Sequence, residues 1–411
     1  MAEIRAAAPD DRAGIALVTG VSFNFQVNPE DVSVAGALCA FEGARLVGTA
    51  RAVPFRQWFG GSQVPCAGVA GVAVLPEFRG RGVAGLLMRE LLGRRRSQDD
   101  AVSTLYPANS ALYRELGYEF AGLRSQLRAP VVDLPPARGV VRELAQGDLP
   151  QVMACFSRYA SGQNGPVESS DPARWTDHIL AHRREGTHQR TVVVDGKDGI
   201  DGYASYFLDN WETGSYGVHC KHLVATTPAA FLTLLGHLRR FENAARDVAW
   251  YGPPSTAPLG LVVASSGFAL SPRLRRWMLR VLDVRRALEC RGYPCVAAEA
   301  VISVDDPLFP ANSGPWFLQV DHGRARVTPA GAGQVGAGQV GAGQVGQAGG
   351  GQKPPGGASR PLPIGLFSAL YSGLATPDDL VLMGALDPGD PRLSSLTALF
   401  SGPLPWMPDF F

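Results

Sequence analysis

The stretch that most constrains the fold runs from Val69 to Leu91 and reads VAGVAVLPEFRGRGVAGLLMREL. It begins with a buried-strand pattern over 69–75, continues through a turn rich in arginine and glycine, and enters a helix near Arg81. The unpaired N–H groups and the dipole at a helix start attract anions, and Arg79 and Arg81 add positive charge. This stretch therefore predicts a phosphate-binding turn between a strand and a helix.

The glycines of this turn fit the same interpretation. Gly80 and Gly82 allow the backbone to approach a ligand closely, although they could also merely close a tight turn. The turn lacks the Lys-Ser/Thr pair of a P-loop and the three spaced glycines of a dinucleotide fold, so neither common nucleotide loop is present. The N–H groups expected to face the phosphates belong to Arg81, Gly82, Val83 and Ala84.

A second motif follows about twenty residues later. A strand pattern over 101–106 leads into NSALYRELGYEF, which contains Asn109, Tyr113 and a Gly-aromatic pair. Together with Arg79-x-x-Gly82-x-Ala84, this motif resembles the GCN5-related N-acetyltransferases (GNAT), which use acetyl-coenzyme A. The resemblance implies that Asn109 helps to bind the coenzyme and that Tyr113 is the general acid. On its own, Tyr113 could equally be a core tyrosine of an amphipathic helix.

The strand before the turn is expected to hold the coenzyme through its backbone. Small residues around Gly71 leave the strand open to the pantetheine amides, which can pair like an added strand. The binding residues predicted here are Val72, Ala73 and Val74, and the N–H of Val72 is expected to meet the oxyanion.

Composition excludes several function classes. A net charge of +1 without a long basic run argues against nucleic-acid binding. Charged residues near the N-terminus argue against a signal peptide, and no apolar run approaches the roughly 18 residues of a membrane span. The 6 scattered cysteines favour reduced thiols in a cytosol, so we expect a cytoplasmic protein without a metal.

The chain of 411 residues is expected to form three mixed α/β (α+β) domains. The predicted boundaries are 1–132 for an active GNAT acetyltransferase domain, 133–279 for a degenerate second GNAT-like copy, and 280–411 for a third unit that opens with a helix over 280–293. VRELAQGDLPQVMACF repeats the opening of the first domain, but the later turn ATTPAA lacks arginine and glycine. The Gly-rich segment 330–360 is expected to be a mobile loop.

The whole chain resembles the enhanced intracellular survival family of N-acetyltransferases through VAVLPEFRGRG, ALYRELGY, GVHCKHLVATTPAA, ALYSG and the aromatic C-terminus. The resemblance implies a sterol-carrier-like third domain, a hexamer, and acetylation of primary amines such as aminoglycosides or lysine side chains. It also implies that the terminal carboxylate, on Phe411 here, is the general base. Asn24 and Gln26 stand in the region of a family acid, and Gly71 replaces a bulky aromatic, which argues against a polycationic aminoglycoside.

Other readings stay open. Phe411 could be an ordinary packed apolar terminus, and Arg94–Arg96 could be a solvated helix end or could reach the 3′-phosphate of the coenzyme. His178 and His182 have metal-like spacing, and His219, Cys220 and His222 lie close together, but neither group offers a full ligand set. The alternative function is a non-catalytic regulatory protein that senses acetyl-coenzyme A or binds a hydrophobic ligand.

Overall fold

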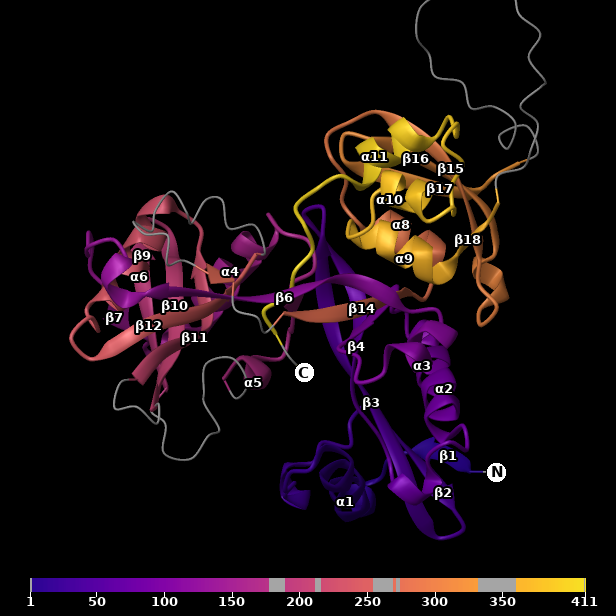
Figure 1. Cartoon of the computed structure of the whole chain (residues 1–411), viewed down its shortest axis with the longest axis horizontal. Helices are drawn as coiled ribbons and strands as arrows, with labels where there is room; N and C mark the ends of the chain where they lie inside the picture. Colours follow the sequence, from indigo (N-terminus) through magenta and orange to yellow (C-terminus); the bar gives the residue numbers. More distant parts are fainter. Residues whose placement is uncertain are drawn as a thin grey trace, which may run out of the picture.

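The computed structural model describes residues 2–176, 189–210, 216–253, 269–270, 274–331, 360–409 and 411. Two α/β units lie side by side and a third packs above the N-terminal one (Figure 1). In the described residues, one 14-stranded sheet runs through the first two units, in the order β1-β2-β3-β4-β5-β14-β6-β12-β11-β10-β9-β7, with β8 paired to β3 and β13 paired to β6 outside this order. A separate sheet of four strands belongs to the third unit. No helix in the described part is long and apolar enough to cross a membrane.

The N-terminal domain has the predicted order of strands and helices. A hairpin turns at Glu42 and Gly43, and the side chains of Phe23 and Phe25 are 43% and 56% exposed. Val18 of α1 packs against Ala73 and Leu75, whereas α2 packs on the opposite face of the sheet. The elements are β1 (Glu3–Ala6), α1 (Arg12–Phe23), β2 (Ala37–Glu42), β3 (Arg45–Phe59), β4 (Ser62–Val74), α2 (Val83–Ser97), β5 (Val102–Leu105), α3 (Ser110–Glu115) and β6 (Glu119–Pro130).

The second domain repeats the opening of the first in detail. Arg5 pairs with Asp11 at 2.7 Å, and Arg142 pairs with Asp148 at 2.5 Å. In each copy the aspartate follows the arginine by six residues. Each aspartate also accepts the N–H three residues before it, so the predicted duplication is confirmed at atomic level. The elements are β7 (Arg142–Glu143), α4 (Leu149–Ala160), β8 (Val167–Glu168), α5 (Pro172–Arg174), β9 (Gln189–Gly196), β10 (Gly199–Asn210), β11 (Tyr216–Ala225), α6 (Pro228–Arg239), β12 (Ala245–Gly252) and β13 (Ala269–Leu270).

Strand β14 (Arg275–Val281) leaves the second domain and inserts between β5 and β6 of the first. The helix predicted over 280–293 is therefore wrong at its start, because Arg280 and Val281 still belong to this strand. Side chains from Trp277 to Val281 are fully buried, which favours the sheet. The helix α8 (Val284–Cys290) begins only where Asp283 accepts the N–H of Arg286.

The third domain packs its helices against one small sheet of order β17-β16-β15-β18. Thr376 caps the start of its helix α10, which begins at Pro377. The Gly-rich segment expected to be mobile lies almost entirely outside the described residues. The further elements are β15 (Ala298–Asp305), β16 (Gly314–Asp321), β17 (Arg324–Pro329), β18 (Leu362–Pro363), α9 (Ile364–Ser372), α10 (Pro377–Leu382) and α11 (Leu393–Phe400).

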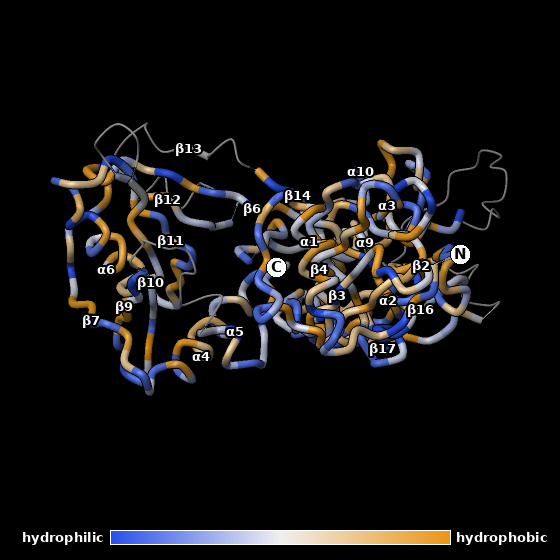
Figure 2. The backbone as a smooth tube through the Cα atoms, turned by 90° about the horizontal axis from the view of Figure 1, so that it is seen from below, coloured by the Kyte–Doolittle hydropathy of each residue, from blue (hydrophilic) through white to orange (hydrophobic). Residues whose placement is uncertain are grey.

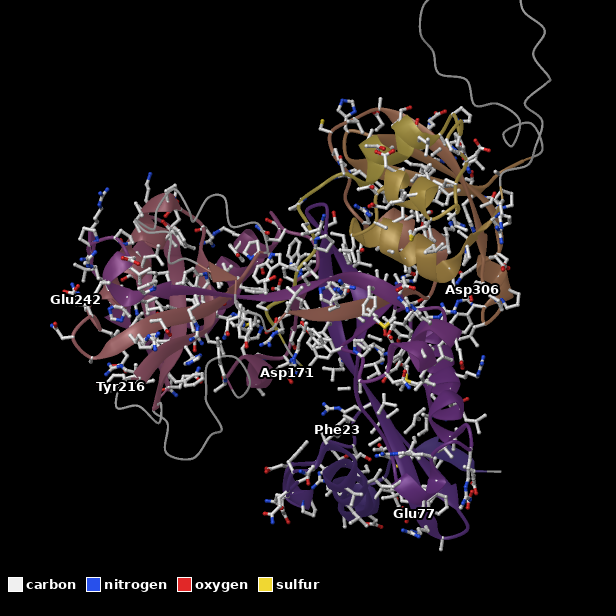
Figure 3. The ribbon with its side chains drawn as sticks, viewed as in Figure 1. Phe23, Glu77, Asp171, Tyr216, Glu242 and Asp306 are labelled. Carbon is white, nitrogen blue, oxygen red and sulfur yellow. The ribbon has the colours of Figure 1, made fainter. Side chains whose placement is uncertain are left out.

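A buried ion pair joins the third domain to the first. Arg280 of β14 donates to Asp306 at 2.8 Å, and both side chains are fully buried. Asp306 lies where the two domains meet (Figure 3). Arg280 also donates to the carbonyl of Leu116, directly after α3. The third domain therefore supports the end of the helix that carries Tyr113.

Candidate active site

Strands β4 and β5 separate in the middle of the N-terminal domain. They pair in parallel only from Cys66 to Gly68, while β4 continues to Val74 alongside β3 alone. The Leu75 N–H donates to β3, so by strand alternation the Val74 N–H faces the side that β5 has left. A bulge opposite β3, with Gly71 at a φ of 60°, leaves further backbone groups near Val72 unused by the sheet. Val72, Ala73 and Val74 thus lie along an open backbone edge.

The glycine turn follows this edge directly. Gly80 and Gly82 adopt φ values of 73° and 78°, and an added Cβ at either position would meet no atom within 4 Å. Helix α2 begins at Val83 with Gly82 as its N-cap and no side-chain cap, so the first N–H groups, including that of Ala84, keep no intrahelical partner. The turn therefore combines open space with unused donors.

The two arginines of the turn are already engaged in part. Arg79 donates through Nε to the carbonyl of Val74 at 3.0 Å, so it holds the end of β4 in addition to adding charge. Arg81 lies 3.7 Å from Glu42 and over the ring of Phe78. Both side chains remain exposed beside the turn.

The second copy lacks an equivalent anion site. Helix α6 is capped by its own Thr227, whose side chain accepts the N–H of Ala230. A capped N-terminus without glycine or arginine offers a phosphate fewer free donors. Within the described residues, the open glycine turn of the first copy therefore offers an anion more free backbone donors than this turn of the second copy.

Tyr113 lies on α3 and is only 6% exposed. Its hydroxyl makes no hydrogen bond to any described residue, whereas the neighbouring Tyr118 hydroxyl is bonded to Ser103 at 2.6 Å. Burial raises the pKa of Tyr113 to about 12, so the phenol is protonated at neutral pH and can donate its proton. Asn109 caps α3 by accepting the N–H of Ala111, which is a structural role apart from any contact with coenzyme.

The C-terminal segment runs between the first two domains. Seen from below, the chain end lies between the two bodies (Figure 2). Its backbone exchanges hydrogen bonds with Leu123 of β6 on both sides of Trp406. Arg124 holds the carbonyl of Pro408 at 2.8 Å. From the second domain, His222 contacts Asp409 at 3.2 Å.

Phe411 ends at the point where β4 and β5 separate. Its ring lies 5.0 Å from that of Phe55 and 6.1 Å from that of Tyr106. A Cβ added to Gly68, the last β4 residue paired with β5, would lie 2.9 Å from the Phe411 ring. The apolar surroundings predicted for this residue are therefore supplied by Phe55 and Tyr106. Trp406 instead contacts the second domain, through Gln163.

Sequence reasoning missed several of these neighbours. Tyr106 was within reach, because it ends the strand that follows the coenzyme strand. Phe55 and His222 carried no local signal, because only the tertiary fold brings them to the chain end.

The histidine groups do not form a metal site in the described residues. His222 lies between Tyr203 and Asp409, and His219 stacks on Phe207. His178 and His182 lie outside the described residues.

The arginine run at the end of α2 is structural. Arg94 and Arg95 pair with Glu90 and Asp100, and Arg96 donates to the carbonyl of Leu282. A helix of 15 residues is about 22 Å long, so these groups lie at the far end from Gly82.

Three family models match the chain in series. They are an acetyltransferase (GNAT) domain over 3–121, a second acetyltransferase (GNAT) domain over 169–281, and a sterol carrier protein domain over 284–408. N-acetyltransferase Eis of Mycobacterium tuberculosis is 27% identical over 354 residues, covering 79% of this chain and 83% of that protein. An uncharacterized N-acetyltransferase of Streptomyces griseus is 26% identical and covers 70% and 73%.

Solved structures agree over the full length. A GCN5-related N-acetyltransferase from Anabaena variabilis superposes with a TM-score of 0.88 at 25% identity, covering 100% of both chains. One from Kribbella flavida gives 0.79 at 28% identity, covering 100% of this chain and 98% of that one. The family models and the full-length relatives agree on the order of domains, and the chain therefore belongs to the Eis-like GCN5-related N-acetyltransferases, which have two acetyltransferase domains and a C-terminal sterol carrier domain.

Proposed function

We propose that this enzyme transfers the acetyl group of acetyl-coenzyme A to a primary amine at the separation of β4 and β5. One observation carries the proposal: the terminal residue, Phe411, packs at Gly68, where an open backbone edge begins that leads to an uncapped helix N-terminus. The edge fits a chain of amides, and the helix start fits a diphosphate. We assign the coenzyme to Val72–Val74 and to the turn 79–84.

The residues present can carry out each step. The amine must lose a proton to expose its lone pair, and we assign this proton to the carboxylate of Phe411. The neutral amine then attacks the thioester carbonyl, whose oxygen gains charge next to the backbone N–H groups near Val72. The carbon–sulfur bond breaks, and the departing sulfur takes a proton from Tyr113. The nitrogen of the adduct gives its second proton to the resulting phenolate, which restores Tyr113. The products are an N-acetyl amine and free coenzyme.

The packing around Phe411 supports its role as a base. Arg124 and His222 hold Pro408 and Asp409, so the tail is fixed from both domains. A base works only from a fixed position within hydrogen-bond reach of its proton. Removing Phe411, or extending the chain beyond it, is expected to lower kcat strongly without weakening coenzyme binding.

Thiol release with a panel of primary amines tests the proposal. We expect turnover with at least one amine, and Tyr113→Phe should lower kcat about 100-fold or more while coenzyme affinity stays unchanged. Tyr216→Phe, in the second domain, is the matched control and should keep full activity. Coenzyme binding by calorimetry without turnover on any amine would favour the sensor instead.

The acceptor and the assembly belong to the same proposal. Lysine side chains and aminoglycosides are the acceptors that the resemblance implies, and a homohexamer is the implied assembly. Light scattering should then give six times the chain mass of 43.6 kDa.

A further inference from the structure

Two arginines converge on the aromatic residues around Phe411. The Arg174 Cζ atom of α5 lies 4.6 Å from the centroid of the Phe55 ring, which packs on Phe411. Arg51 lies opposite Ala70, two residues beyond Gly68 on β4. It precedes Phe55 by four residues on β3, so both side chains point to the same face of the sheet. Arg174 and Arg51 thus bring charge from two domains to one place.

Neither arginine has a carboxylate partner in the described part of the chain. Arg51 donates through Nε to the carbonyl of Ala35 at 3.2 Å, and the contact of Arg174 is with the Phe55 ring. Burial lowers the pKa of both guanidinium groups. Asp409 raises the pKa of Arg174 again, whereas the charge of Arg51 lowers it further, so the two cations repel each other.

The nearby carboxylates are committed elsewhere. Asp409 contacts His222 at 3.2 Å, and Asp171 caps the start of α5 by accepting the N–H of Ala173 at 3.0 Å. Asp171 lies on the side of the second domain that faces the first (Figure 3). Phe411 forms no ion pair with either arginine within 4.0 Å. Neither guanidinium is therefore paired directly with any of these carboxylates.

We infer that the acceptor amine also carries a carboxylate, which binds between Arg51 and Arg174 while its apolar body rests on Phe55. This inference rests on the proposed function and names its substrate class: amino acids or peptides with a free carboxylate. A half-buried guanidinium without a counter-ion is costly, and a planar carboxylate accepts two of its N–H groups at once. A polycation such as an aminoglycoside would instead be repelled.

Matched amines that differ only by the carboxylate test the inference. We would compare phenylalanine with phenethylamine, and lysine with cadaverine, with acetyl-coenzyme A as the donor. Total concentrations are chosen so that the concentration of the deprotonated amine is equal within each pair. The carboxylated member should have a kcat/KM roughly 10- to 100-fold higher, mainly through a lower KM. Arg174→Met should remove most of this preference, because kcat/KM should fall much more for phenylalanine and lysine than for phenethylamine and cadaverine.

The control is Arg285→Met, which removes an exposed arginine of α8 paired only within its own helix. It should keep the preference intact. Equal use of both members by the wild-type enzyme, or an equal loss for all amines in Arg174→Met, would overturn the inference. Succinyl-coenzyme A, whose acyl group carries a carboxylate, serves as a second donor. If Arg174→Met lowers activity only with this donor, the arginines bind the acyl carboxylate and not that of the acceptor, and the inference is overturned.

Failure of the inference differs from failure of the proposed function. No thiol release with any amine would reject the proposed function. Calorimetry with phenylalanine and phenethylamine would then still report on the arginines, because tighter binding of phenylalanine that Arg174→Met abolishes supports the site. Equal binding of both compounds would reject it.

Discussion

Gly68→Ala is the most informative single perturbation of the active site, because it adds one carbon where the two strands separate. The new Cβ would lie 2.4 Å from the Phe55 ring and 2.9 Å from the Phe411 ring. Carbon atoms in favourable contact are about 3.5–4.0 Å apart, so both rings must move by about 1 Å.

Stability and activity should respond to this change very differently. Overpacking costs about 1–3 kcal/mol, and the loss of glycine freedom in the unfolded chain offsets about 0.5–1 kcal/mol. The net loss in the free energy of unfolding is therefore about 0–2.5 kcal/mol. A displacement of about 1 Å near the reacting atoms can lower kcat about 100-fold. The fall in kcat should therefore be much larger than the loss of stability alone would cause.

The assay pairs urea denaturation with steady-state thiol release. Gly93→Ala is the matched control, because its Cβ meets no atom within 4 Å, and a helical alanine should stabilise α2 by about 0.5–1 kcal/mol with normal kcat. Adding Phe55→Leu to Gly68→Ala should restore part of kcat by making room for Phe411. If kcat of Gly68→Ala stays within about twofold of wild type, the chain end does not act at this point.

Three further predictions concern the supports of the site. Asp306→Ala leaves the charge of Arg280 buried without its partner, so chemical denaturation should show a loss of about 3–5 kcal/mol in the free energy of unfolding. Because burial raises the pKa of Tyr113 to about 12, the phenol stays protonated in mild alkali, and kcat at saturating substrates should show no alkaline decline from about pH 8 to about pH 10. A decline there that Tyr113→Phe removes would contradict this pKa. His222→Leu breaks the contact with Asp409 and should lower kcat about 5- to 20-fold at unchanged KM for coenzyme. His222→Gln can still bond to Asp409 and should recover part of kcat. Equal losses of kcat in both variants would mean that His222 acts only through its packing.

The strand, glycine turn and helix of the first domain, and the helical position of Tyr113, could be predicted because their signals are local. A strand, a glycine turn and a helix follow one another within Val69–Leu91, and Tyr113 lies in a second short motif. The repeated opening at Arg142 was visible for the same reason. In each case neighbouring residues in the sequence determine the geometry.

The surroundings of the chain end were beyond local reasoning. Arg174 and Phe55 are more than a hundred residues apart, and neither carries a motif. The strand at Arg275–Val281 was missed, and its last two residues were assigned to a helix, because a short apolar run fits a strand or a buried helix equally well. Its place between β5 and β6 depends on long-range pairing that no local pattern encodes.

The insertion of β14 has a consequence for synthesis. Until residue 281 has been made, β5 and β6 lack the strand that pairs with both of them. Two unpaired edges invite association with other chains, so an excised fragment ending near residue 132 should aggregate rather than work as a minimal catalyst. Recombining this acetyltransferase module with another protein would require transplanting its distant strand as well.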